Sequence, residues 1–404
     1  MGWRAILLLV LLASCAAPAP PEDMSKGPDP AAWFPADYDA SRARFRADCA
    51  RYVTSARDFC RDWKVPSATD PDLTVDYGLF SGGGDRLLVL QSGIHGPEGE
   101  SGAAAQFYFM NTYLPALRAK GVDVLIIHAM NPWGYKHVRR NDETNTNLNR
   151  NFSVDGSDYQ FDNDSYRRFR GVFEPQGPVG SVFWGSARGT FGFLGGFVGG
   201  GFSGDALNNG LNNGQYAFPE GINYGGRAPR PQQGFLVERI KPILARPYRK
   251  TWYLDFHTGL GADGVLSVIL GKKPAPGPRQ ELQRLFGSDQ AQGIEITDPT
   301  TSPGFFADYG DVIDFVPSLS SRPDAFLAVT MEYGTMGLDP VNELRSANRM
   351  ILDSEKYNFH CASQAVCDEV DANTREMFNP SDVVWRHKVL READLVFRTL
   401  QDQF

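Results

Sequence analysis

The chain has 404 residues, of which 42% are apolar and 22% are charged, and its formal net charge is −8. This composition is typical of globular proteins and excludes collagen-like, coiled-coil and wholly disordered chains. An acidic chain without a long basic run is poorly suited to binding nucleic acid. The length allows one large α/β domain or two smaller ones.

The first fifteen residues, MGWRAILLLVLLASC, have the pattern of an export signal. Arg4 supplies a positive charge, and the apolar run after it is too short to span a membrane. The tetrapeptide ending at Cys15 resembles the bacterial lipobox, in which the cysteine is lipidated. We therefore expect an exported lipoprotein of the cell envelope, anchored to a membrane through Cys15. The alternative is a cleaved signal without lipid. Residues 16–33 are predicted to be a tether.

Four further cysteines follow, at positions 49, 60, 361 and 367. In an oxidising compartment this even number favours two disulfides. If residues 37–62 formed one straight helix, Cys49 and Cys60 would lie about 16 Å apart at 1.5 Å per residue, too far for a bond. A bridge between them therefore requires a break in that helix, and the sequence leaves the pairing open.

Apolar runs alternate with helical periodicity along the chain, which predicts an α/β fold. We expect one catalytic domain over 34–404, with a mixed, mostly parallel central sheet and helices on both faces. The expected elements, in chain order, are a helix over 35–52 opened by Asp37 or Asp39, a hairpin-like strand over 74–80, a strand over 86–91, a helix over 99–119, a strand over 122–129, a helix over 234–245, strands over 251–256, 265–270 and 325–331, and helices over 340–353 and 381–401.

Residues 153–230 interrupt this alternation and hold much of the glycine of the chain. Because aromatic side chains alternate there with Gly and Asn, we expect irregular but ordered loops over one face of the domain. A disordered insertion is the alternative, since a segment of this length is unusual inside a compact domain.

Metal-ligating side chains follow two of the predicted strands. His95 and Glu98 stand three residues apart after the strand 86–91, and His257 follows the strand 251–256. Ligand sites in α/β sheets lie beyond the carboxyl ends of strands, so we expect these side chains to converge. Two histidines and one glutamate leave a coordination position open, which is typical of a catalytic site for one zinc ion.

Two further segments carry groups suited to catalysis. Glu332 ends another apolar strand. Burying a carboxylate there costs free energy, so a buried glutamate indicates a function, and one such function is that of a general base. Residues 131–152 combine Arg139, Arg140 and Arg150 with many asparagines. Arginine binds carboxylates and stabilises oxyanions, while asparagine both donates and accepts hydrogen bonds. We expect a substrate site there, the alternative being a solvated basic loop.

These segments, in this order, resemble the zinc metallocarboxypeptidase superfamily of carboxypeptidase A. The resemblance is closer to a bacterial branch catalogued as a domain of unknown function, and it covers most of the chain from about residue 34. The motifs of that branch are HGxEG, NPxGxxxxRR with NLNRNF, GQYxxPxGxxYGG, DFHTGLG and E-[FY]-G-T. They correspond here to residues 95–99, 131–152, 214–226, 255–261 and 332–335.

The resemblance implies roles for single residues. His95, Glu98 and His257 would bind the zinc ion. Glu332 would take a proton from the attacking water and pass it to the leaving amine. Arg140 would polarise the scissile carbonyl and hold the oxyanion.

For the substrate and the supporting residues, the resemblance is less complete. Asn149 and Arg150 would bind the carboxylate of the substrate, and Arg139 is a further candidate. The aspartate that supports a zinc histidine in the superfamily is replaced here by Asn147, which accepts a hydrogen bond but carries no charge. Asp255 lies two residues before a proposed ligand, on the same strand face, and would either compensate or serve the other histidine.

The resulting hypothesis is a zinc hydrolase that cleaves an amide bond next to a free carboxylate, as a metallocarboxypeptidase or a cell-wall peptide amidase does. Aspartoacylase and succinylglutamate desuccinylase resemble the same set of residues, so N-acyl amino acids are alternative substrates. A third hypothesis is a non-catalytic envelope lipoprotein that binds peptides.

Overall fold

The computed structural model describes residues 23–198, 204–272, 276–286, 295–297, 309–337 and 339–404. In this part of the chain, eight strands form one sheet in the order β1-β2-β4-β3-β5-β8-β6-β7. The strands are β1 (Phe59–Lys64), β2 (Thr74–Phe80), β3 (Arg86–Ser92), β4 (Val122–His128), β5 (Lys250–Gly259), β6 (Leu266–Leu270), β7 (Glu295–Thr297) and β8 (Phe326–Gly334).

The sheet is mixed and mostly parallel at its centre, as predicted. The pairs β3–β4, β3–β5, β5–β8 and β6–β7 are parallel. The pairs β1–β2, β2–β4 and β6–β8 are antiparallel. The apolar runs of β3 and β4 are buried on both faces because each lies between two other strands and beneath helices.

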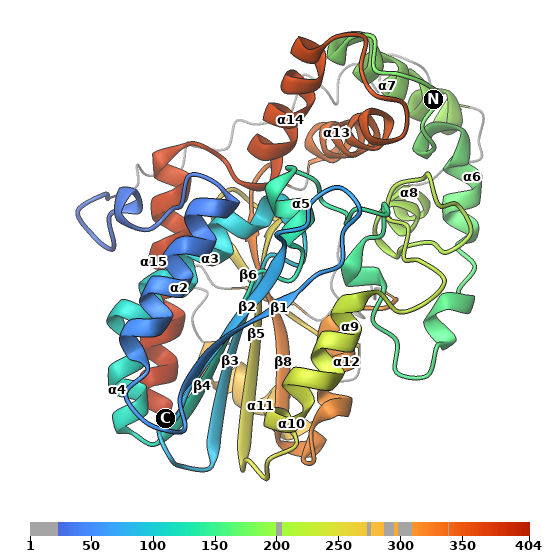
Figure 1. Cartoon of the computed structure of the whole chain (residues 1–404). Coiled ribbons are helices and arrows are strands. Elements are labelled where there is room, and N and C mark those ends of the chain that lie inside the picture. Colours follow the sequence, from blue (N-terminus) through green and yellow to red (C-terminus); the bar gives the residue numbers. More distant parts are fainter. Residues whose placement is uncertain (1–22, 199–203, 273–275, 287–294, 298–308, 338) are drawn as a thin grey trace.

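Helices cover both faces of the sheet (Figure 1). On one side lie α2 (Tyr38–Tyr52), α3 (Gly99–Thr112), α4 (Leu114–Ala119), α11 (Pro276–Phe286) and α15 (Val383–Gln403). On the other side lie α9 (Pro231–Phe235), α10 (Lys241–Leu244) and α12 (Val312–Phe315). The short α5 (Pro132–Lys136) follows β4.

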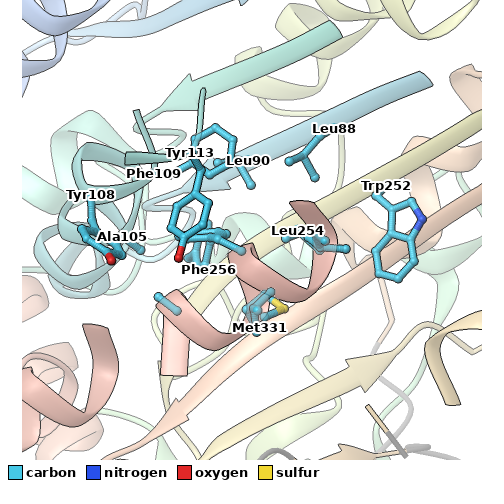
Figure 2. Packing of buried hydrophobic residues seen from close by; sticks show 14 of the residues in the cluster. Leu88, Leu90, Ala105, Tyr108, Phe109, Tyr113, Trp252, Leu254, Phe256 and Met331 are labelled. Carbon is cyan, nitrogen blue, oxygen red and sulfur yellow. The ribbon is translucent and has the colours of Figure 1, made fainter. Parts of the chain in front are cut away.

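Alternate residues of the central strands β4, β3, β5 and β8 enter two separate cores, as the period of a strand requires. Leu88 and Leu90 of β3 pack with Phe256 of β5 and Met331 of β8 against α3, as Figure 2 shows. The intervening residues of β3, Leu87 and Val89, pack on the opposite face.

A third group of helices lies together at the top of the view in Figure 1. It consists of α6 (Asp164–Phe173), α7 (Val182–Val198), α8 (Gly204–Asn212), α13 (Pro340–Phe359) and α14 (Gln364–Phe378). The first three belong to residues 153–230, so the expectation of irregular loops is wrong for much of that segment. Its glycines are compatible with helix because packing overrides their low propensity: α6 packs on α8, and α7 packs on α13.

The predicted hairpin after 74–80 is also wrong. The turn after β2 does lead to β3, but β4 lies between these two strands in the sheet. Asp123 of β4 holds that turn, since its Oδ1 accepts hydrogen bonds from Ser81 Oγ at 2.9 Å and from Gly82 N at 2.9 Å.

Other boundaries differ from the predicted ones for local reasons. The expected helix over 99–119 is divided at Tyr113, next to Pro115, which has no N–H to continue the hydrogen-bond pattern. Asp37 is the N-cap of α2 and accepts from Ala40 N at 2.8 Å. Strands β1 and β7 and helices α5, α11, α12 and α14 were not predicted.

Two disulfides settle the pairing that the sequence left open. Cys49 lies in the last turn of α2 and Cys60 lies in β1, so the helix ends between them and their Cα atoms are 6.0 Å apart. Cys361 and Cys367 form the second bridge, with Cα atoms 5.6 Å apart, between α13 and α14.

The N-terminal part of the chain is only partly described. The predicted signal, Cys15 and residues 16–22 lie outside the described residues. Within the predicted tether, Pro30–Ala32 form a 3-10 turn, and the ring of Trp33 lies 5.4 Å from that of Tyr108 in α3. Ordered packing on the domain therefore begins before residue 34. Among the described residues, no helix combines the length and the apolar character needed to cross a bilayer.

Candidate metal centre

The centre lies at the carboxyl ends of three adjacent strands, β3, β5 and β8. After β3 the chain turns at Gly93, whose φ of 67° favours glycine, and reaches His95 and a 3-10 turn, Gly96–Glu98. His257 of β5 is paired with Glu332 of β8 in the parallel register, so the two side chains emerge on the same face. Four of the predicted residues are thereby brought together.

His95, Glu98 and His257 form a buried cluster suited to a metal ion, their ligand atoms lying within 4.8 Å of one another. The Glu98 carboxylate lies between the two rings. His95 Nδ1 is 2.8 Å from Oε1, and His257 Nδ1 is 3.2 Å from Oε2. Two imidazole nitrogens and a carboxylate oxygen match the donor preference of zinc, so the residues present fit the predicted ion.

Each histidine is held from behind through its other nitrogen. His95 Nε2 lies 3.0 Å from Asn147 Oδ1, and His257 Nε2 lies 2.7 Å from Asp255 Oδ2. The second oxygen of Asp255 accepts from Gln91 Nε2 at 2.9 Å. This is the usual support of a metal-binding imidazole, with one amide oxygen and one carboxylate in that position. Asn147 and Asp255 thus lie where the sequence suggested.

The two histidines differ in electrostatics. Burial and the positive charge of Arg140 lower the pKa of His95 to about 3. Burial also lowers the pKa of His257, but the charges of Asp255 and Glu98 outweigh it and hold the pKa well above its usual value. Burial raises the pKa of Glu98, whereas the two histidines hold it well below its usual range. The two carboxylates beside His257 thus favour the protonated form of its ring.

Glu332 is the fourth buried group of the centre. Burial, together with the charge of Glu98, raises the pKa of its carboxyl to about 7. Its Oε1 accepts a hydrogen bond of 2.8 Å from Leu260 N, which fixes the carboxyl just beyond the end of β5. A carboxyl with this pKa is suited to take up and release a proton near neutral pH.

One cavity of about 170 Å³ is lined by His95, Glu98, His257 and Glu332. Arg140, Asn149 and Arg150 also line it. The cavity wall is completed by α8, α13 and α14 and by the N-cap residue of α12, through residues that the sequence did not single out. These are Leu211, Asn212, Asp311, Glu343, Ser346, Ala347, Met350, Met377 and Phe378.

Arg139 lies elsewhere and is not among the described residues that line the cavity. Its guanidinium is 3.4 Å from Asp353 and donates a hydrogen bond of 2.8 Å to Asn145 Oδ1. It also lies over the ring of Tyr357, with its central carbon 4.1 Å from the ring centre. The position of Arg139 indicates that it joins the 131–152 segment to α13.

The predicted carboxylate binders make internal hydrogen bonds. Arg150 Nε donates to the backbone oxygen of Asn212 at 2.9 Å, and Nη1 donates to that of Asn149 at 2.7 Å. The Asn149 side chain donates to Asp311 at 3.2 Å and accepts from Val312 N at 3.1 Å. Both side chains are thus held rigidly at the edge of the cavity.

Sequence reasoning gave no role to Asn223, although it lies within the motif at 214–226. Its side chain is buried and contacts both Asn147 and Arg140. A positive φ of 52° at a residue other than glycine marks it as unusual. The partners lie more than seventy positions away in the chain, and Asn223 occupies an unspecified position of the motif, so no sequence signal pointed to this residue.

The model of a family described as "Protein of unknown function (DUF2817)" matches residues 34–392. The chain belongs to this family. No curated protein matches the chain. The family description assigns no activity, so the function of the chain is argued from its site.

Several solved structures are similar to the chain. Carboxypeptidase A from Helicoverpa armigera is 13% identical, with a TM-score of 0.44, and 92% of this chain and 80% of that chain are covered. Bovine thrombin-activatable fibrinolysis inhibitor is 14% identical, with a TM-score of 0.44 and coverage of 83% and 97%. A succinylglutamate desuccinylase/aspartoacylase from Rhodobacter sphaeroides is 13% identical, with a TM-score of 0.36 and coverage of 76% and 67%.

Proposed function

We propose that the chain is a zinc-dependent hydrolase that cleaves an amide bond next to a free carboxylate. The observation that carries this proposal is the content of one cavity. It holds a buried His-Glu-His cluster, a carboxyl group with a pKa near neutrality, and the cationic side chains of Arg140 and Arg150. These are the groups that amide hydrolysis requires, namely a metal site, a base and a stabiliser of the oxyanion.

His95, Glu98 and His257 would hold the ion, with Asn147 and Asp255 orienting the imidazoles. Zinc at such a site acts as a Lewis acid and makes water more acidic. Glu332 takes a proton from the attacking water and returns it to the leaving nitrogen, as its raised pKa allows.

Arg140 places a positive charge where the carbonyl oxygen becomes negative, and an oriented charge in a buried site stabilises that oxyanion strongly. Arg150 also lines the cavity and adds positive charge there, which favours a substrate with a free carboxylate. The cavity therefore suits a peptide C-terminus.

A second candidate is the removal of an acyl group from an N-acyl amino acid. Leu211 and Asn212, which end α8, contribute to the cavity wall together with α13. This wall favours short substrates, and an N-acyl amino acid carries the same amide and carboxylate as a peptide C-terminus.

The two candidates are separated by one substrate series on the zinc-loaded protein. The series contains N-acyl amino acids, di- to pentapeptides with free C-termini, and the same peptides with amidated C-termini. We expect cleavage only of compounds with a free carboxylate, and loss of cleavage with a chelator or in Glu332→Gln. Cleavage that survives both treatments contradicts the proposal. A preference for N-acyl amino acids over every peptide favours the second candidate.

We further propose that the protein is exported to the bacterial cell envelope and carries lipid at Cys15. The lipobox-like tetrapeptide and the two disulfides support this location, since disulfides persist in oxidising compartments. Metabolic labelling with a fatty acid in a bacterial host is expected to mark the wild type and not Cys15→Ser. Equal labelling of both excludes this anchor.

A further inference from the structure

Asn223 connects the support of a metal ligand to the arginine of the cavity. Its side-chain oxygen accepts a hydrogen bond of 2.9 Å from Asn147 Nδ2 and a second one from Arg140 Nη1. Asn147 Oδ1 in turn lies 3.0 Å from His95 Nε2. One buried oxygen atom thus joins the two sides of the candidate catalytic centre.

The orientation of Asn223 is itself fixed. Its Nδ2 donates to the backbone oxygen of Leu211, and its backbone oxygen accepts from Gln215 N at 3.1 Å. Its φ of 52° lies in the left-handed region, which asparagine tolerates better than most residues. The next residue, Tyr224, accepts a hydrogen bond from Asn147 N at 2.7 Å. Backbone and side chain therefore hold Asn223 against the 145–151 segment.

This contact has a chemical consequence because residue 147 is an asparagine. A carboxylate presents an oxygen in either orientation, whereas an amide presents either an acceptor or a donor. If Asn147 turned its NH₂ group toward His95, Nε2 would become the acceptor and the proton would move to Nδ1. Nδ1 is the atom that faces Glu98 in the metal cluster, and a protonated nitrogen does not bind a metal.

We propose that Asn223 is a positioning residue with two tasks. By accepting from Asn147 Nδ2, it keeps Oδ1 of Asn147 toward His95, so that Nδ1 of His95 is free to bind the ion. By accepting from Arg140, it holds the guanidinium at the cavity. The backbone N–H of Asn149, which donates to Asn147 Oδ1 at 3.0 Å, favours the same orientation. The inference rests on the proposed zinc hydrolase function.

Three variants separate positioning from general stability. Asn223→Gly removes the side chain but tolerates the left-handed backbone. Asn223→Asp keeps the accepting oxygen. Asn145→Gly is the matched control, because Asn145 is also buried, has a φ of 60° and accepts from an arginine, which in this case is Arg139 outside the cavity.

The measurement is a titration of the metal-free protein with zinc in competition with a chromophoric chelator. We expect Asn223→Gly to bind zinc about 10-fold more weakly, the lower end for changes behind a metal ligand. Asn223→Asp and Asn145→Gly are expected to stay within about twofold of the wild type. In the background Asn147→Ala, Asn223→Gly should weaken binding by less than about twofold, because the two residues act in series.

A second arm uses a substrate that the wild type cleaves. Asn223→Gly is expected to lower kcat more than it raises KM, because Arg140 acts on the oxyanion.

The zinc titration needs no substrate, so its result remains decisive even if amide hydrolysis is not found. A wild type that binds no zinc contradicts the proposed function. The positioning role is overturned if Asn223→Gly binds zinc as tightly as the wild type does. It is also overturned if the control Asn145→Gly weakens zinc binding as much as Asn223→Gly does.

Discussion

At the scale of single residues, the two histidines of the centre are supported unequally. His257 is held by the carboxylate of Asp255, and His95 is held by the amide of Asn147. The negative charge that supports the ligands is therefore on the β5 side of the cluster. A carboxylate makes the imidazole that it contacts a stronger metal ligand than an amide does. We therefore expect Asp255 to contribute more to metal affinity than Asn147.

The exchange of these supports gives the first prediction. Asp255→Asn is expected to weaken zinc binding by about 10–100-fold, and Asn147→Asp is expected to strengthen it. Competition titration of the metal-free variants at constant pH measures both. Opposite signs are required, and a loss of affinity in both variants would mean that geometry, not charge, dominates.

The second prediction concerns pH. Burial and the charge of Glu98 raise the pKa of Glu332 to about 7, and a base has to be deprotonated to act. The value of kcat/KM should therefore rise as pH increases, with the midpoint at or below about pH 7, because a nearby cation lowers the pKa of a carboxyl. Glu332→Gln should lower kcat by about 10²–10⁴-fold while zinc still binds. A flat profile between pH 5 and 8 would remove Glu332 from the role of base.

At the scale of elements, α7 turns glycines toward α13 and exposes several of its large side chains, although Phe193 is buried. A Cβ atom on Gly185 would lie 2.5 Å from Leu352, and one on Gly189 would lie 2.0 Å from Asn348, both in α13. Phe183, Trp184 and Phe191 are exposed on the other side. Close approach to α13 thus depends on glycine, which is why a glycine-rich sequence forms a helix here.

The third prediction tests this packing. Gly189→Leu should lower the free energy of unfolding by about 1–3 kcal/mol, because the added side chain overpacks the contact with Asn348. Gly195→Ala, where nothing lies within 4 Å of the new Cβ, is the control. It should raise stability by up to about 1 kcal/mol through helix propensity. Urea denaturation followed by circular dichroism compares the two, and equal effects would contradict the close approach of α7 and α13.

At the scale of the whole molecule, the candidate metal ligands join segments far apart in the chain, at 95–98 and at 257. A ligand that binds only the folded state stabilises it by a free energy that grows with the logarithm of the ratio of its concentration to its Kd. The fourth prediction is that zinc raises Tm of the metal-free protein and that a chelator reverses the shift. The Tm of His257→Ala with zinc should equal the Tm of the same variant without zinc. A shift that persists in this variant would place the stabilising ion elsewhere. Differential scanning calorimetry provides the measurement.

The sequence predicted the parts of this molecule that are governed by local pattern. Apolar runs gave the strands β3, β4, β5 and β8, because strands buried on both faces are continuous in apolar residues. Residues of metal-ligating types at the ends of these strands predicted the position of the candidate metal centre. The helices of 153–230 were missed because glycine is a weak helix former when considered alone. Asn223 was missed because hydrogen bonds to distant partners leave no periodic signal.

The position of α13 in the chain has a consequence for biosynthesis. This helix supplies Glu343, Ser346, Ala347 and Met350 to the cavity, and it packs on α7, about 150 residues earlier in the chain. A ribosome therefore releases His95 and Glu98 long before the wall that encloses them. No nascent chain that ends before residue 340 holds a complete cavity, so products truncated between residues 257 and 340 carry the candidate metal ligands without the enclosed pocket that the proposed chemistry needs.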